Sequence, residues 1–230
     1  MNILALDTSM GACSAAVLRA DGGPARVLHL REQMMERGHA EALMPMVAEV
    51  MQEAGLDFAG VDLIAATTGP GSFTGVRIAI AAARGLALVT RAQLYGTDSL
   101  TVMARAAHLS GVTSRAPFAV AVDARRGMLY LGLYDESGRR IEGPLLIAPD
   151  DAAALLPSRL KVAVGSGAAL LADPAMRHGK RAEATKPHLQ PSAGMLAEIA
   201  LEAGETVPIL RPLYLRPPDA KPQAQTVVRR

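Results

Sequence analysis

The stretch of sequence that decides the fold reads Thr67-Thr68-Gly69-Pro70-Gly71-Ser72-Phe73-Thr74-Gly75-Val76-Arg77. An apolar run at 61–66 leads into it, and a longer apolar run at 75–91 leads out of it. Three glycines and a proline between two such runs predict a tight strand-to-helix loop that closely approaches a ligand or another backbone. Ser72 or Thr74 can cap the helix, whose first N–H groups can receive an anion. The Gly-Lys-Ser/Thr of a Walker A phosphate loop is missing, so the residues favour a structural role.

Composition indicates a globular α/β protein with one large domain or two small ones. Half of the 230 residues are apolar, which is enough for a sizeable core. The net charge of +2 and the pI of about 8.9 are too mild to indicate a nucleic-acid binder by themselves. Aromatic residues make up 3% of the chain and Trp is absent, which argues against a base-stacking platform for RNA.

The sequence also predicts a soluble, cytoplasmic protein that is not bound to a membrane. Cys13 is the single cysteine, which excludes an internal disulfide and suits a reducing compartment. The N-terminus shows no basic region before its first apolar run. The longest apolar run, 78–89, contains Arg84 and is too short to span a bilayer.

Hydrophobic periodicity divides the chain into two similar halves. In the first half we expect strands at 3–6, 12–18, 26–30, 61–66 and 93–95, and helices at 40–54, 75–91 and 99–108. In the second half we expect strands at 118–122, 128–134, 140–147 and 161–164, helices at 150–156 and 193–203, a helical stretch after Gly165-Ser166-Gly167, and a polar loop at 173–191.

A repeated strand end relates the two halves. Ala5-Leu6-Asp7-Thr8-Ser9-Met10-Gly11 matches Ala121-Val122-Asp123-Ala124-Arg125-Arg126-Gly127, since each has an apolar strand, a terminal aspartate and a glycine four positions later. Such a repeat predicts two β-β-β-α-β-α lobes facing one another across a cleft. We place the first lobe at 1–110 and the second at 111–230, with the C-terminal helix a candidate to pack back on the first lobe and 218–230 a mobile tail.

The decapeptide Gly69-Pro70-Gly71-Ser72-Phe73-Thr74-Gly75-Val76-Arg77-Ile78 closely resembles the signature of the TsaB (YeaZ) family. The segments 3–9 and 212–216 are also similar to motifs of that family, so the resemblance spans nearly the whole chain. It implies an actin/hexokinase/chaperone-ATPase-like fold. It also implies a subunit, without catalytic activity of its own, of the bacterial machinery that makes threonylcarbamoyladenosine in tRNA.

The resemblance implies partners as well. The catalytic subunit TsaD is expected to be bound and activated as a heterodimer, and the small ATPase TsaE to join that pair. The chain alone is expected to form a homodimer, and tRNA to be met only through the complex. No cofactor belongs to the chain itself, and ATP with magnesium is expected at the complex through TsaE and TsaD.

The two helices at 40–54 and 75–91 are the predicted partner interface, because both are rich in small or adaptable apolar residues. Small residues recur every four positions along the second helix. The candidate contact residues are Leu43, Met44, Val47, Met51, Gly75, Ala79, Ala83 and Ala87. We expect Ala83→Glu to abolish pairing and to leave the fold intact.

The strand ends of both halves are candidates for a vestigial nucleotide site, since an aspartate that ends a strand can hold magnesium. Its residues are Asp7, Thr8, Ser9, Asp123, Gly165 and Gly167. No catalytic residue and no metal ligand is assigned, because neither a His-Glu-x-x-His motif nor a Ser-His-Asp set is present. Three alternatives remain: a nucleotide-dependent kinase or ATPase, a metallopeptidase, and direct tRNA binding by the basic stretch 177–186.

Overall fold

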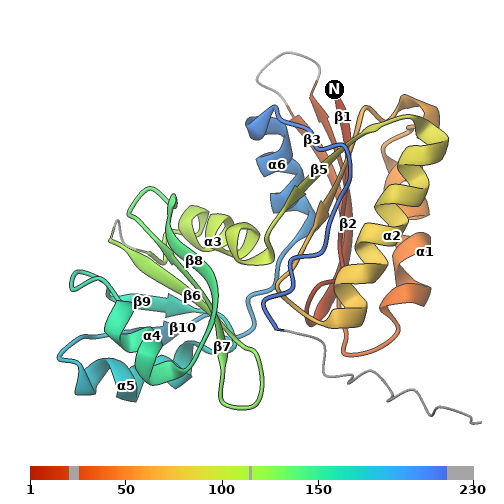
Figure 1. Cartoon of the computed structure of the whole chain (residues 1–230). Helices are drawn as coiled ribbons and strands as arrows, with labels where there is room; N and C mark the ends of the chain where they lie inside the picture. Colours follow the sequence, from red (N-terminus) through yellow and green to blue (C-terminus); the bar gives the residue numbers. More distant parts are fainter. Residues whose placement is uncertain (21–25, 114–115, 217–230) are drawn as a thin grey trace, which may run out of the picture.

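A computed structural model describes residues 1–20, 26–113 and 116–216, and the predicted tail at 218–230 lies outside them (Figure 1). Within these residues the chain forms two five-stranded mixed sheets. The first sheet has the order β3-β2-β1-β4-β5 and is built from β1 (Asn2–Asp7), β2 (Ala12–Ala20), β3 (Arg26–Met34), β4 (Leu63–Thr67) and β5 (Gln93–Thr97). The second has the order β10-β9-β6-β7-β8 and is built from β6 (Phe118–Asp123), β7 (Leu129–Tyr134), β8 (Arg140–Ile147), β9 (Val162–Val164) and β10 (Glu183–Thr185).

The two sheets have the same topology. In each, the first strand pairs antiparallel with the second and parallel with the fourth, so β1 corresponds to β6 and β4 to β9. The predicted duplication into two similar α/β lobes is therefore confirmed. Each half carries one strand and one helix beyond the β-β-β-α-β-α unit. In the first half these are β5 and α3 (Ser99–Leu109), which correspond to the predicted strand at 93–95 and helix at 99–108. In the second half β10, which was not predicted, adds the equivalent parallel edge strand.

Helices cover both faces of the first sheet, and the alternation of β1 shows why. Leu4 and Leu6 point to the face covered by α1 (His39–Glu53) and α2 (Phe73–Thr90). Ile3 and Ala5 point to the opposite face, which is covered by α6 (Ala193–Ala203). Figure 1 shows α1 and α2 on one side of this sheet and α6 on the other. Since both faces are buried, β1 reads as a continuous apolar run.

The second sheet is covered in the same way. Phe118 and Val120 of β6 pack against α3 (Ser99–Leu109). Ala119 and Ala121 face the layer formed by α4 (Pro149–Leu155), the 3-10 helix η2 (Ala168–Leu171) and α5 (Ala172–Arg177). The remaining 3-10 helix in the described chain, η1 (Phe58–Gly60), precedes β4.

The last helix of each half crosses over to the other lobe. Most buried apolar side chains of α3 belong to the core of the second sheet, although α3 precedes residue 110, and Val102 alone of them packs in the core of the first sheet. Those of α6 belong to the core of the first sheet, although α6 lies near the C-terminus. From here on, the first lobe means the β1–β5 sheet with α1, α2 and α6, and the second lobe means the β6–β10 sheet with α3, α4 and α5.

The predicted polar loop at 173–191 is wrong in part, because it contains most of α5 and all of β10. These elements are short, and their stability comes from contacts that periodicity does not reveal. Arg177 of α5 pairs with Asp150 of α4. The Lys180 ammonium donates to the carbonyl oxygens of Ala153 and Ala154 at 3.0 and 2.7 Å, close to the end of α4.

Helix α2 is the one helix among the described residues that is long and apolar enough to cross a membrane, by length and composition only. Its mean hydropathy is 1.4 over 18 residues, and 28% of them are buried in this structure. One side of α2, with Val76, Ala79 and Ala83, packs on the first sheet. The apolar residues of the other side lie at the surface.

Candidate functional site

The glycine loop at 69–75 packs directly on the backbone that follows β1. The Ser72 N–H donates to the Ser9 carbonyl at 2.8 Å, and the Thr8 hydroxyl donates to the Gly75 carbonyl at 2.6 Å. A Cβ on Gly71 would lie 2.1 Å from the Ser9 oxygen, and one on Gly75 would lie 2.0 Å from the Thr8 oxygen. Both glycines are therefore required by a close approach between two segments of backbone.

Asp7 lies under this loop and is fully buried. Its carboxylate accepts hydrogen bonds from the Thr67 hydroxyl and, at 2.8 Å, from the Ser9 hydroxyl. Burial raises the pKa of Asp7 from 3.8 to about 6, and these hydrogen bonds oppose the rise. Because Thr8 and Ser9 are also fully buried, none of the three predicted first-lobe residues is open to a ligand in this structure.

The equivalent strand end of the second lobe is open. The Asp123 side chain is 33% exposed, and one of its oxygens accepts from the Arg125 N–H at 2.7 Å. The Asp123 N–H donates to the Ser166 hydroxyl at 3.1 Å. A Cβ on Gly165 would lie 2.5 Å from the Ala121 oxygen, and one on Gly167 would lie 2.9 Å from the Asp123 nitrogen. These two glycines let the 165–167 turn pack closely on the end of β6.

A cleft of about 890 Å³ separates the lobes beside these strand ends. One wall comes from Ser72 and Phe73 of the signature loop. The opposite wall comes from Asp123 and Ser166. The charged residues that line the cleft are Glu36, Arg37, Asp123, Arg125 and Arg216. Of these, Asp123 alone is a predicted site residue. From the sequence, Arg216 is only part of the motif at 212–216, and Glu36, Arg37 and Arg125 are not assigned to a site, because the fold brings these residues together from segments with no common pattern.

The two family-like motifs at 69–78 and 212–216 meet at the rim of this cleft. The rings of Phe73 and Tyr214 stack with centroids 5.5 Å apart. The Arg77 guanidinium carbon lies 3.7 Å from the Phe73 ring centroid, and its Nε donates to the Tyr214 hydroxyl at 2.6 Å. The Leu213 N–H donates to the Thr68 carbonyl at 2.7 Å. The late motif therefore holds the C-terminal segment against the signature loop.

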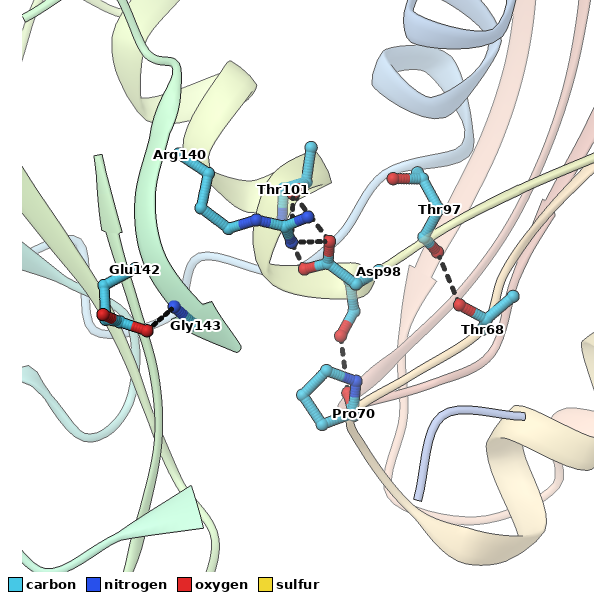
Figure 2. Close-up of polar contacts among 9 residues, drawn as sticks. Thr68, Pro70, Thr97, Asp98, Thr101, Arg140, Glu142 and Gly143 are labelled. Atoms are coloured by element: carbon cyan, nitrogen blue, oxygen red, sulfur yellow. Dashed lines mark hydrogen bonds and ion pairs between the residues drawn. The ribbon is translucent and has the colours of Figure 1, made fainter. Parts of the chain in front are cut away.

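A polar junction also links the loop to the second lobe (Figure 2). Asp98 caps α3 by accepting from the Thr101 N–H at 3.0 Å, and Arg140 of β8 donates to the same carboxylate. The next residue, Ser99, donates its N–H to the Gly69 carbonyl at 2.8 Å and its hydroxyl to the Pro70 carbonyl. Contacts thus run without interruption from β8 through the start of α3 to the glycine loop.

The structure corrects most of the predicted interface residues. Six of the eight lie in the core of the first lobe and cannot contact a partner in this structure: Leu43, Val47, Met51, Gly75, Ala79 and Ala83. Met44 is 43% exposed, and Ala87 is half-buried. The small residues at four-residue spacing let α2 approach its own sheet, and the face that looks outward carries Ala81, Gly85, Leu88 and Val89.

No group of three or more His, Cys, Asp or Glu side chains that could hold a metal ion occurs in the described parts of the chain. His39 lies in the first turn of α1, with its Nε2 3.0 Å from the Met10 carbonyl oxygen. Cys13 is buried, and burial raises the pKa of its thiol to about 11. At neutral pH this thiol is therefore protonated and a poor nucleophile.

Comparison with known proteins gives relatives over nearly the whole chain. A family model described as "TsaD: tRNA N6-adenosine threonylcarbamoyltransferase" matches residues 32–204. The Escherichia coli K12 protein "tRNA threonylcarbamoyladenosine biosynthesis protein TsaB" is 36% identical over 140 residues, which cover 60% of this chain and 58% of that protein. An uncharacterized protein of Mycobacterium tuberculosis H37Rv is 33% identical over 96% of this chain and 95% of its own length. The alignment to the Escherichia coli protein thus spans less than two thirds of it.

Solved structures agree with the sequence relatives. The structure described as "YeaZ from Pseudomonas aeruginosa" has a TM-score of 0.79 and 32% identity, covering 93% of this chain and 99% of that one. A crystal structure of a Pseudomonas aeruginosa protein "with similarity to peptidase YEAZ" has a TM-score of 0.80 and 32% identity, covering 94% and 99%. With the signature loop and the late motif joined at one cleft rim, these relatives show that the chain belongs to the TsaB (YeaZ) family.

Proposed function

We propose that this chain is a scaffold and activating subunit in the synthesis of threonylcarbamoyladenosine in tRNA, which binds the catalytic subunit TsaD. The names of its relatives support the pathway. Partner binding to one conformation of TsaD would stabilise that conformation and so activate it. TsaE and ATP with magnesium would act at the assembled complex, and the chain alone would pair with a second copy.

The observation that carries this proposal is the outer face of α1 and α2. Leu88 and Val89 are each 84% exposed, although both are large and apolar. Met44, in the second turn of the neighbouring α1, is also an exposed apolar side chain. On α2, one and two turns before Leu88 and Val89, Gly85 and Ala81 form a smooth stretch on which a partner helix can pack closely. An apolar face of this kind indicates a protein–protein contact.

Leu88→Glu is expected to abolish pairing with TsaD and to leave the fold intact, because the side chain lies at the surface. Size-exclusion chromatography with light scattering on the mixed proteins measures this directly. The matched control is Leu109→Glu, which makes the same change at an exposed residue ending α3 in the second lobe. Wild type and control should form a one-to-one complex; a folded Leu88→Glu chain that paired normally would refute the interface.

Ala83→Glu is not a suitable test, contrary to the expectation from the sequence. Ala83 is fully buried between α2 and the first sheet. A glutamate there would bury an unpaired charge in the core and destabilise the fold. A loss of pairing would then report unfolding instead of a blocked surface.

The cleft favours a second candidate, a nucleotide-dependent kinase or ATPase, because its volume of about 890 Å³ suits a small ligand. We expect no heat of magnesium–ATP binding in calorimetry on the wild-type chain. The reason is that Asp7, the first-lobe residue such chemistry would need, is sealed beneath the glycine loop. Saturable magnesium–ATP binding that is abolished by Asp123→Ala would instead support a kinase or ATPase function.

A further inference from the structure

Three loops meet at the mouth of the cleft, at the end of the second sheet where three parallel strands have their carboxyl ends. Strands β6, β9 and β10 are parallel neighbours, so their carboxyl ends lie together. Arg125 follows β6, the 165–167 turn follows β9, and Lys186 follows β10. The Gly165 N–H donates to the Lys186 carbonyl at 3.3 Å, which joins the second and third loops. Open α/β sheets bind their ligands outside the carboxyl ends of their strands.

The backbone of these loops is strained. Arg125 has a φ of 65°, Arg126 of 55° and Lys186 of 47°, all in the left-handed region. A residue with a Cβ pays about 1 kcal/mol or more for this conformation. Four non-glycine residues adopt it among those that the structure describes, and three of the four are these cations. Strain of this kind concentrates at functional sites, where the surroundings hold it in place.

Positive charge gathers at the same place. The Arg125 side chain is 86% exposed, with its guanidinium 3.6 Å from the Asp123 carboxylate. An exposed pair of this kind is weak and can be exchanged for another anion. Arg216 donates to the Arg125 carbonyl at 3.3 Å, and Arg37 lines the same cleft. We call Arg37, Arg125, Lys186 and Arg216 the cationic mouth.

The basic stretch 177–186, a tRNA-binding candidate from the sequence, is divided by the fold. Arg177 pairs with Asp150, and Lys180 bonds to carbonyls beside the end of α4. These two charges serve contacts inside the second lobe. Lys186, at the other end of the stretch, is exposed at the cationic mouth. A basic tract thus contributes to this surface through its last residue.

We infer that the cationic mouth contacts the backbone phosphates of the tRNA substrate, an inference that rests on the proposed function. Three of the four cations line the cleft, and Lys186 is exposed outside it at the neighbouring strand end, so the positive charge continues from the cleft onto the surface. An extended polyanion, in which successive phosphates repeat along the chain, fits such a distribution of charge. A converging clamp for one nucleotide would need both strand ends, and the first-lobe end at Asp7 is buried.

The test measures tRNA affinity by fluorescence anisotropy with a labelled tRNA transcript, for the full chain alone and for its complex with TsaD. The double variant Arg125→Glu/Lys186→Glu should bind about tenfold more weakly or worse, with a salt slope smaller by about one for each lost phosphate contact. The control Arg139→Glu/Arg159→Glu makes the same charge change at two exposed residues. They lie at the other end of the strands of the second sheet, away from the carboxyl ends of β6 and β9. The control should change the affinity by less than about threefold.

Each outcome decides the inference. An unchanged affinity of the double variant, an equal loss in the control, or a wild type that binds no tRNA in either form would overturn it. So would a loss confined to ATP or inorganic phosphate, titrated as separate probes, since the site would then hold a small anion. Complex formation with TsaD is followed independently by light scattering. Its failure in the wild type would refute the proposed function, and the titration of the chain alone would still decide the phosphate contact.

Discussion

Gly75→Ala is expected to destabilise the protein by about 3 kcal/mol or more, which lowers Tm by roughly 6–12 °C for a chain of this size. Alanine is the better helix former, so its intrinsic propensity would favour the change. The new Cβ, however, would lie 2.0 Å from the carbonyl oxygen of Thr8. This oxygen belongs to the backbone that follows β1 and cannot move aside without shifting the loop. Urea denaturation of the variant measures the loss.

The same substitution at Gly85 provides a control with the opposite sign. Gly85 lies three turns further along α2, and nothing stands within 4 Å of where its Cβ would be. Gly85→Ala should therefore stabilise the protein by up to about 1 kcal/mol through helix propensity and chain entropy. Equal effects at the two positions would show that the contact between the glycine loop and Thr8 does not determine stability.

The signature loop shows which features of the fold can be predicted from the sequence and which cannot. Three glycines and a proline predict a tight turn with a close neighbour, and the structure has one. Which neighbour it is depends on tertiary structure, since Thr8 and Ser9 lie more than 60 residues away. The stacking of Tyr214 on Phe73 was equally hidden, because the two residues are joined only by the path of the C-terminal segment.

Hydrophobic periodicity does not predict which side of α2 faces the sheet and which side is free to bind a partner. Helix α2 is apolar nearly all round, so the pattern predicts burial on more than one side but does not assign the sides. The small residues Ala79 and Ala83 could face a partner or the helix's own sheet, and they face the sheet. The start of α2 is held in this orientation by the close contact of Gly75 with Thr8, in the segment that follows β1, and the sequence contains no signal for that contact.

The two aligned aspartates show the same limit. Asp7 and Asp123 end corresponding strands, and their local sequences predict equivalent roles. The glycine loop covers Asp7, whereas the equivalent turn at 165–167 leaves Asp123 partly exposed to the cleft. Pairing of strands could be inferred from the repeat, but burial depends on what packs over each strand end.

The burial of Asp7 leads to a prediction about pH. Its pKa in the folded protein is about 6, against an ordinary value of 3.8, because the buried carboxylate loses its hydration. The folded state therefore keeps a proton that the unfolded state releases, and stability falls as pH rises from about 4 to about 6. Above this window the loss is complete, and a pKa difference of about two corresponds to about 3 kcal/mol.

Asp7→Asn removes this titration. Its stability relative to wild type should therefore rise by about 2.5 kcal/mol from pH 4 to pH 8, since part of the unfolded-state carboxyl is already ionised at pH 4. The amide oxygen can still accept from the Thr67 and Ser9 hydroxyls, which now bond to the carboxylate. Urea denaturation of both proteins across this range gives the difference between their free energies of unfolding. The contributions of all other titrating groups cancel in this difference. A difference that stayed constant with pH would mean that Asp7 has the same pKa in both states.

Asp135→Asn is a control with the opposite slope. The Ser137 hydroxyl, with backbone N–H groups of the same turn, lowers the pKa of Asp135 in the folded protein. Its ionised form therefore stabilises the fold above the unfolded pKa, and this contribution is lost as pH falls through the folded value. As pH falls, the stability that Asp135→Asn loses relative to wild type should shrink. Over the same range the stability of Asp7→Asn relative to wild type should decrease. Asp7 is buried beneath the glycine loop, whereas Asp135 lies at the surface and pairs with Arg139 at 3.2 Å, so opposite slopes would follow from these two environments.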